Sequence, residues 1–152
     1  MIVKPGDFAD PQILDLLRLH LQGMADSSPP GHSFALDLSG LQRPDVTFLS
    51  VWDDGTLLAI GAIKELAADH GELKSMRTRT DRLRSGAGSL MLLSLLDLAI
   101  TRGYRRVSLE TGTGEPFEPA LALYRKHGFR DGEAFADYVR SDFNQFLHLD
   151  LA

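Results

Sequence analysis

Cysteine is absent from this 152-residue chain, and its absence excludes several kinds of chemistry at once. Disulfide bridges, thiolate metal sites and cysteine nucleophiles cannot form. The lack of cysteine also fits a reducing compartment. The five histidines do not suggest a metal site either, because none pairs in a His-Glu-x-x-His spacing or groups with acids as metal ligands do. We therefore expect no bound metal.

Long hydrophobic runs are also missing. The longest run, residues 90–100, is interrupted by Ser94 and Asp97 and is too short to cross a bilayer. The first residues, MIVKPGDFADP, have no apolar core of the kind that marks a signal peptide. We therefore expect a cytoplasmic protein that has no membrane partner.

Positive charge is scarce overall, since the formal net charge is −5 at pH 7. A chain of this charge is not expected to bind nucleic acid. The basic residues are nevertheless concentrated just before Gly86: Lys74, Arg77, Arg79, Arg82 and Arg84. Such a concentration is compatible with a solvated strand end and loop, or with a site for a small polyanion.

The length and the composition suit one domain, residues 1–152, since 43% of the residues are hydrophobic and 24% are charged. Hydrophobic patterning predicts an α/β chain in which consecutive strands are followed by a βαβ crossover, which gives a mixed sheet. The expected strands are 1–5, 46–52, 56–66, 71–78, 104–111 and 143–151. The expected helices are 11–26, 35–41, 87–102 and 116–128, the third of them capped by Gly103.

The glycine-rich turn RLRSGAG, residues 82–88, directly precedes the most apolar of these helices. A helix N-terminus exposes unpaired N–H groups and a partial positive charge, and glycines allow a ligand to approach the backbone. Together these features favour a phosphate site. The turn is not a P-loop, because it lacks the Gly-Lys-Ser/Thr ending. It is not a dinucleotide fingerprint either, because Met91 stands where the third glycine is required.

The segment LRSGAG, residues 83–88, instead resembles the acetyl-coenzyme A loop of the GNAT N-acetyltransferase superfamily, Gln/Arg-x-x-Gly-x-Gly/Ala. Both glycine positions match, whereas Leu83 departs from the pattern. A second segment, ALALYRKHGF at 120–129, resembles the Ala-x-x-x-Tyr-x-x-x-Gly-Phe motif of the family, with Phe117 in place of a common asparagine. The element order matches over nearly the whole chain. The segments GELKSMRT, SLETG, FEPALALY and FADY further resemble a bacterial subgroup of acetyltransferases.

The resemblance implies the GNAT fold, which is a mixed, mostly antiparallel central sheet flanked by helices and splayed between its fourth and fifth strands. It also implies acetyl-coenzyme A as co-substrate. The pantetheine arm would pair with the open edge of the fourth strand, and the pyrophosphate would meet the amides of the turn. The implied cofactor contacts are Met76, Thr78, Leu83, Arg84, Ser85, Gly86, Ala87, Gly88, Ser89 and Tyr124.

The implied reaction is direct attack of a primary amine on the thioester. An amine with a pKa near ~10.4 is mostly protonated at neutral pH and needs a base. Glu72 is the candidate base, because a period of two places it on one strand face with Met76 and Thr78. Glu110 on the neighbouring strand is the alternative base. By the family motif, Tyr124 would protonate the departing thiolate, and a backbone N–H near Met76 would stabilise the oxyanion.

Acceptor contacts are expected from two loops and one strand: His32, Phe34, Asp37, Glu110, Phe135, Asp137 and Tyr138. The residues are compatible with a small amine, an amino acid, an antibiotic or a protein N-terminus as acceptor. The family is often dimeric, so a homodimer is possible. Two other readings of the chain are a catalytically inactive acyl-CoA-binding sensor or partner domain, and a helper domain that binds no nucleotide.

Overall fold

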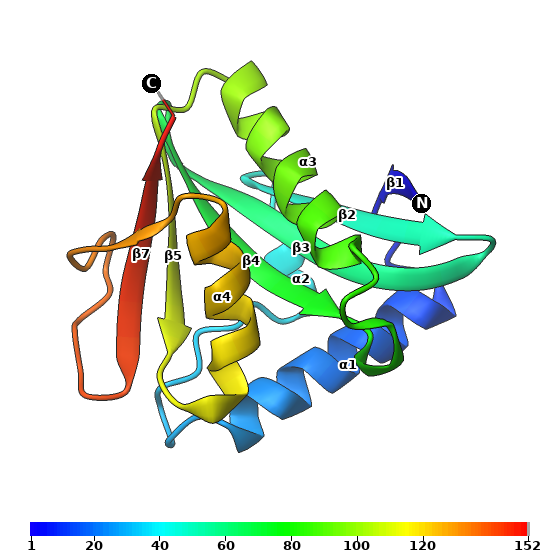
Figure 1. The fold of residues 1–152 in the computed structure, drawn as a ribbon, viewed down its shortest axis with the longest axis horizontal. Coiled ribbons are helices and arrows are strands. Elements are labelled where there is room, and N and C mark those ends of the chain that lie inside the picture. The colour runs from blue at the N-terminus through cyan, green and yellow to red at the C-terminus, as the bar shows by residue number, and fades with distance from the viewer. Residues whose placement is uncertain (152) are drawn as a thin grey trace.

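A mixed seven-stranded sheet forms the centre of the computed structural model, which describes residues 1–151 (Figure 1). Its strands lie in the order β1-β2-β3-β4-β5-β7-β6, and only β4 and β5 run parallel. The strands are β1 (Ile2–Pro5), β2 (Val46–Asp53), β3 (Thr56–Ala67), β4 (His70–Thr78), β5 (Arg106–Gly112), β6 (Arg130–Asp131) and β7 (Asn144–Asp150). The α-helices are α1 (Pro11–Asp26), α2 (Leu38–Leu41), α3 (Ala87–Thr101) and α4 (Glu118–Lys126).

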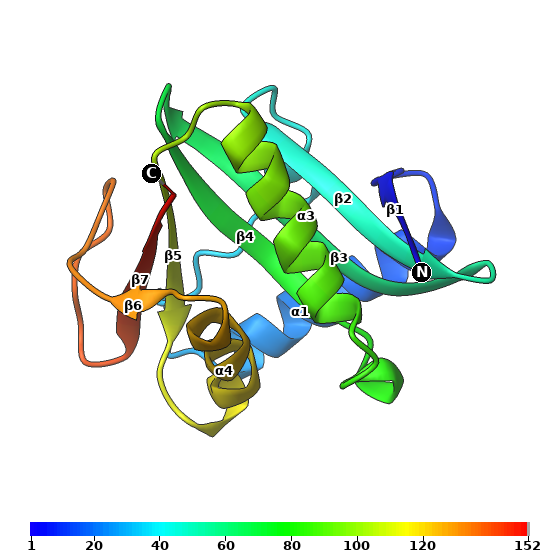
Figure 2. The same cartoon turned by 45° about the horizontal axis from the view of Figure 1, so that its top comes forward.

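Helices cover both faces of the sheet. Helices α3 and α4 lie on one face and α1 lies on the other (Figure 1 and Figure 2). The α3 face holds the larger apolar core, which includes Met91, Leu92 and Leu95. The α1 face holds a second core, to which α1 contributes Ile13 and Leu17. Within residues 1–151, no helix combines the length and the apolar character that a bilayer span requires.

The element order predicted from the sequence is confirmed, with small differences at the ends. Strand β5 begins two residues later than expected, because the amide of Tyr104 still donates to Ala99 at the end of α3. The expected helix 116–128 begins with a 3₁₀ turn, η2 (Glu115–Phe117), before α4 starts. The two-residue strand β6 was not expected, since a pair of residues carries no detectable alternation.

Strands β4 and β5 pair over only three residues each, 70–72 with 106–108. Beyond this point β4 stays with β3, and β5 stays with β7. Within residues 1–151, the later residues of β4 therefore have no strand partner on the β5 side, and a gap opens between the two strands. Helix α4 lies over the wide end of this gap (Figure 1). The expected splay between the fourth and fifth strands is confirmed.

A β-bulge interrupts β4 at Ser75. The register with β3 shifts between Ile60 and Ala62, and Ser75 has a φ of +56°. Such a bulge inserts one extra residue into a strand, and every side chain after it then changes face. The Ser75 hydroxyl is buried and has no hydrogen-bond partner within residues 1–151.

The bulge corrects one expectation from the sequence. Met76 packs with the core of the α3 face, and Thr78 approaches Gly88 at the start of α3. Glu72 instead lies on the opposite face with Lys74. The prediction that Glu72 shares a face with Met76 and Thr78 is therefore wrong, because strict alternation does not continue through an extra residue.

Candidate functional site

The candidate site lies on the α1 face of the gap, where β4 carries a buried ion pair. The Glu72 side chain is 4% exposed and the Lys74 side chain is 9% exposed. Lys74 Nζ lies 3.3 Å from Glu72 Oε2 and donates to the Tyr138 hydroxyl at 2.9 Å. Tyr138 in turn donates to the same Glu72 oxygen. Two donors thus hold Oε2 of Glu72 in a fixed position, as a buried charge requires.

Glu110 provides a second carboxyl group from the other side of the gap. Ser108 of β5 pairs with Glu72, and Glu110 lies two residues after Ser108 on the same strand. Glu110 is therefore on the same face of the sheet as Glu72. Burial, with a further contribution from the negative charge of Glu72, raises the pKa of Glu110 to about 7, although Lys74 acts in the opposite direction. A carboxyl group with this pKa exchanges its proton near neutral pH, which suits a general base.

Tyr124 of α4 belongs to the core on the α3 face. It is 6% exposed, and its ring centre lies 5.7 Å from that of Phe129. Burial raises the pKa of Tyr124 above its ordinary value, and the positive charge of Arg77 partly offsets this effect. The phenol therefore stays protonated at neutral pH, as a proton donor must.

The glycine-rich turn connects β4 to α3, as expected. Gly86 has a φ of +91° and precedes α3 without a side-chain cap, and its missing Cβ would face open space apart from the Met1 side chain at 3.6 Å. The Ser85 hydroxyl accepts from the amide of Ala87. Gly88 has a packing role, since a Cβ there would lie 3.2 Å from Thr78 Oγ1.

The concentration of basic residues before Gly86 does not act as one group. Lys74 pairs with Glu72 inside the site, and Arg79 pairs with Asp81 at 2.9 Å. Arg77 is half-buried against α1. The exposed basic residues of the turn itself are Arg82 and Arg84.

The two loops expected to contact the acceptor meet each other beside the ion pair. The ring centres of Phe34 and Tyr138 are 5.3 Å apart, and those of His32 and Phe143 are 5.9 Å apart. Phe135 is buried against Tyr138 at 5.1 Å. Tyr138 therefore connects the aromatic side chains of both loops to Glu72.

Two of the expected acceptor contacts, Asp37 and Asp137, do not join the hydrogen-bonded group at Glu72 within residues 1–151. Asp37 caps α2, where it accepts from the amide of Gly40 at 2.8 Å and from the Ser39 hydroxyl at 2.9 Å. These hydrogen bonds, led by that from the Gly40 amide, lower the pKa of Asp37, so its carboxylate has a structural role. Asp137 is exposed, and its neighbour Tyr138 rather than Asp137 itself reaches Glu72.

A chain of two histidines and a serine closes the narrow end of the gap, and no pattern in the sequence predicted it. Ser108 Oγ lies 2.6 Å from His70 Nε2 and 2.6 Å from His148 Nδ1. His148 Nε2 lies 2.7 Å from the carbonyl oxygen of Glu133, which can only accept. His148 Nε2 therefore carries a proton, and where Nδ1 carries none, Ser108 donates to His148 Nδ1 and His70 donates to Ser108.

This chain joins β4, β5 and β7 across the sheet. Burial lowers the pKa of His70, with a further contribution from the positive charge of Arg106, and this favours the neutral form of His70. The members lie 38 and 40 residues apart, so no local pattern could bring them together.

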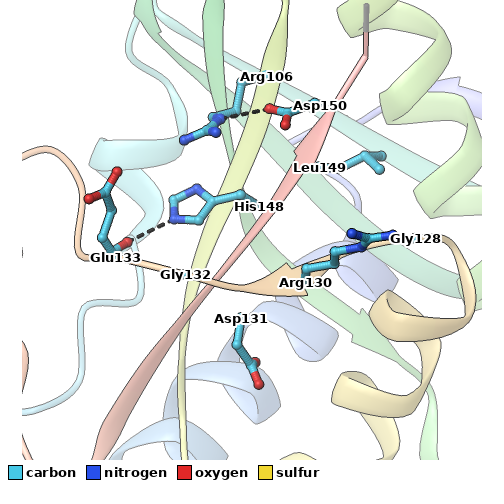
Figure 3. A pocket seen from close by; sticks show the side chains of 9 residues that line it. All are labelled: Arg106, Gly128, Arg130, Asp131, Gly132, Glu133, His148, Leu149 and Asp150. Atoms are coloured by element: carbon cyan, nitrogen blue, oxygen red, sulfur yellow. Dashed lines mark hydrogen bonds and ion pairs between the residues drawn. The ribbon is translucent and has the colours of Figure 1, made fainter.

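A surface hollow of about 570 Å³ lies beyond His148, at the far edge of the sheet (Figure 3). Its wall includes the Arg106–Asp150 ion pair, with 2.9 Å between the charged atoms. Its lining does not include Glu72, Glu110 or Tyr124, so this hollow is not where the candidate chemistry is located. Within residues 1–151, no group of three or more histidines and acids is arranged to hold a metal ion.

The electrostatic coupling of the site gives a first prediction. Lys74→Met should raise the pKa of Glu110 above 7, because the cation that lowers it is removed, and Glu72→Gln should lower it, because a neighbouring negative charge is removed. Carboxyl ¹³C NMR of glutamate-labelled protein over a pH series measures both shifts. Lys126→Met, at an exposed position of α4, is the control and should change nothing. An unchanged Glu110 pKa in Lys74→Met would contradict the arrangement.

Known proteins resemble this chain in sequence and in fold. The profile of the family described as "Acetyltransferase (GNAT) family" matches residues 13–129. The N-acetyltransferase YedL of Escherichia coli (strain K12) is 47% identical over 98% of this chain and 94% of its own length. An acyl-CoA N-acyltransferase structure from Klebsiella pneumoniae has a TM-score of 0.83 at 24% identity, covering 99% of this chain and 97% of that one. An aminoglycoside 6'-N-acetyltransferase complexed with coenzyme A has a TM-score of 0.76 at 14% identity, with the same coverage. The chain belongs to the GNAT family of acetyltransferases.

Proposed function

We propose that this protein carries out its acetyl transfer in the gap between β4 and β5, by direct attack of a primary amine on acetyl-coenzyme A. Membership of the family makes the chain an N-acetyltransferase, and the coenzyme A complex of a structural neighbour supports acetyl-coenzyme A as its co-substrate. The observation that carries the location is the end of β4–β5 pairing after Glu72 and Ser108. The comparisons give no support to an inactive binding domain or a helper domain.

The open edge of β4 is the proposed place for the pantetheine arm. Its amides would pair with the backbone near Met76 and Thr78, as an added strand does. The bulge at Ser75 supports this, because a bulge leaves backbone groups outside the regular ladder. One such N–H near Met76 is the proposed oxyanion donor.

The turn before α3 is the proposed site of the pyrophosphate. The first amides of a helix have no partner within the helix, and the helix dipole favours an anion there. Exposed Arg82 and Arg84 lie in the same turn and add positive charge. The proposed contacts in this turn are Leu83, Arg84, Ser85, Gly86, Ala87, Gly88 and Ser89, with hydroxyl groups from the two serines.

Glu110 is the better-supported base of the two carboxyl groups. Its raised pKa, about 7, allows it to take a proton from an ammonium near neutral pH. Oε2 of Glu72 already accepts from Tyr138 and pairs with Lys74. We infer that Glu72, the base first expected from the sequence, orients the amine instead.

Tyr124 is the proposed proton donor to the leaving group. Glu110 first takes a proton from the ammonium and passes it to solvent, and the neutral amine then forms its new bond to the acetyl carbon and loses a second proton to Glu110. The carbon–sulfur bond breaks, the electron pair stays on sulfur, and the Tyr124 hydroxyl supplies the proton that makes the free thiol. Both groups then return to their starting states by exchange with solvent, so the cycle is balanced and needs no covalent enzyme intermediate.

Aromatic side chains form the proposed wall for the acceptor. Phe34 is 39% exposed and touches Tyr138, while His32 and Phe135 lie in the same pair of loops. The acceptor amine would therefore pass Tyr138 to reach Glu72 and Glu110. The expected cytoplasmic location and homodimer stay predictions.

Substitution of each carboxyl group tests the assignment of the base. Glu110→Gln should lower kcat by roughly a hundredfold and remove the rise of activity with pH near neutrality. Glu72→Gln should keep that rise, moved to lower pH, and should mainly raise KM for the amine. Free-thiol release with the fastest acceptor of a primary-amine panel measures both. Loss of the rise in Glu72→Gln but not in Glu110→Gln would make Glu72 the base.

A pair of glycine substitutions tests the cofactor turn. Gly86→Val should weaken acetyl-coenzyme A binding by about tenfold or more, because a side chain would stand between the ligand and the backbone. Gly103→Val is the matched control, since Gly103 also has a positive φ, +82°, with open space at its Cβ, but lies at the other end of α3. Calorimetry should find normal affinity in Gly103→Val. Equal affinity in the two variants would place the pyrophosphate elsewhere.

A further inference from the structure

Tyr138 covers the Glu72–Lys74 ion pair. Its hydroxyl accepts from Lys74 Nζ at 2.9 Å and donates to Glu72 Oε2. Lys74 also donates to Oε2, at 3.3 Å, so two donors already occupy the two lone pairs of this oxygen. The Glu72 side chain as a whole is 4% exposed. An amine that arrives from solvent therefore meets Tyr138 before it can contact Glu72.

Tyr138 belongs to a segment, residues 132–143, that connects β6 to β7 without a helix or a strand. Both ends of the segment are fastened. The amide of Gly132 donates to a carbonyl oxygen of β7 at 2.9 Å, and the buried side chain of Asn144 donates to the carbonyl oxygen five residues before it at 3.0 Å. Within residues 1–151, the stretch 134–138 forms hydrogen bonds with other parts of the chain only through the Tyr138 hydroxyl.

The packing of the segment allows Tyr138 to move by itself. Phe135 anchors the middle of the segment, since it is 9% exposed and its ring centre lies 5.8 Å from that of Phe146 and 5.6 Å from that of His148. Tyr138 is only partly buried, and the residues on either side of it are exposed. The Tyr138 side chain can therefore turn outward while Phe135 stays in place.

We propose that Tyr138 holds the acceptor site closed, and that the acceptor amine opens it by taking the place of the Tyr138 hydroxyl at Glu72. This inference rests on the proposed role of Glu72 in orienting the amine. Both groups donate a hydrogen bond to a carboxylate, and the arriving ammonium, which is charged, donates the stronger one. The exchange of donors therefore favours an amine over water as the molecule that opens the site.

Closure has a measurable consequence for amine binding. A ligand that binds only the open form has an apparent affinity reduced by the open fraction. Hydrogen bonds to two charged groups favour the closed form here. Removal of the Tyr138 hydroxyl should therefore enlarge the open fraction and strengthen apparent amine binding. A hydroxyl that contacts the bound acceptor directly would give the opposite result, because its removal would weaken binding.

Tyr138→Phe removes the hydroxyl and keeps the ring. It should raise kcat/KM for the fastest acceptor of a primary-amine panel by about threefold or more. In the free protein it should also speed reductive methylation of Lys74 by formaldehyde about tenfold, because labelling of a covered group follows the open population. Mass spectrometry measures the labelling, with exposed Lys126 as internal reference. Tyr104→Phe is the matched control and should change neither quantity, since the buried Tyr104 donates to a different glutamate, Glu65, at 2.8 Å.

Each measurement can overturn the inference. A fall or no change of kcat/KM in Tyr138→Phe would show that the hydroxyl does not compete with the amine. Unchanged labelling of Lys74 would show that the hydroxyl does not keep the site closed. A normal KM for the amine in Glu72→Gln would instead contradict the proposed role of Glu72, and the labelling result, which needs neither acceptor nor turnover, would stand apart from it.

If Tyr138→Phe does not fold, fluorine NMR of the unsubstituted protein gives the answer. The chain has three tyrosines, so protein labelled with 3-fluorotyrosine gives three signals, and Tyr104→Phe and Tyr124→Phe identify two of them. When coenzyme A and the fastest acceptor are bound, the Tyr138 signal should gain the H₂O/D₂O isotope shift of an exposed ring. A Tyr138 signal that keeps the isotope shift of the free protein would overturn the inference.

Discussion

The short parallel pairing between β4 and β5 is the constraint on which the rest of the site depends. Hydrogen bonds join the two strands over residues 70–72 and 106–108, and then each strand follows its other neighbour. The His70–Ser108–His148 chain fastens the closed end through two hydrogen bonds at Ser108 and a third from His148 to the carbonyl oxygen of Glu133. Without this closed end, nothing would fix the point at which β4 and β5 diverge. The distance between the two strands at the open end would then not be defined.

The bulge at Ser75 determines which side chains face the acceptor and which face the cofactor-side core. Before the bulge, Glu72 and Lys74 turn toward α1, and after it Arg77 does so as well. Met76 turns toward α3. One extra residue thus gathers an anion and two cations of a single strand on one face. The same change exposes backbone groups at the edge where the thioester is proposed to lie.

Much of this architecture can be predicted from the sequence. Apolar spacing and Pro11 located α1 to the residue, and Gly103 located the end of α3. The two glycines of the turn and the Tyr124 segment indicated the family. Gly86 is required by its positive φ, and Gly88 by the close approach of Thr78. The fold could be predicted because these patterns are local, and local patterns can be recognised in a single sequence.

The electrostatics of the site could not be predicted in the same way. Glu72 and Glu110 look alike in the sequence. Lys74 and Tyr138 hold Glu72, the second from a loop 66 residues away, whereas burial raises the pKa of Glu110. Asp37 looked like a loop ligand, yet it caps α2, which begins at Leu38 and so three residues later than the helix expected at 35–41. No glycine marks the bulge at Ser75. The predicted alternation of side-chain faces along β4 therefore continues through the bulge and is wrong after it.

Amide hydrogen exchange with and without coenzyme A tests the central claim most directly. Binding of coenzyme A should slow the exchange of amides in the second half of β4, at 75–78, and in the turn at 84–89. Amides of β5–β7 pairs at the far edge should exchange at unchanged rates. If coenzyme A binds and the amides at 75–78 exchange as before, the cofactor does not lie along the open edge of β4, and the account is wrong.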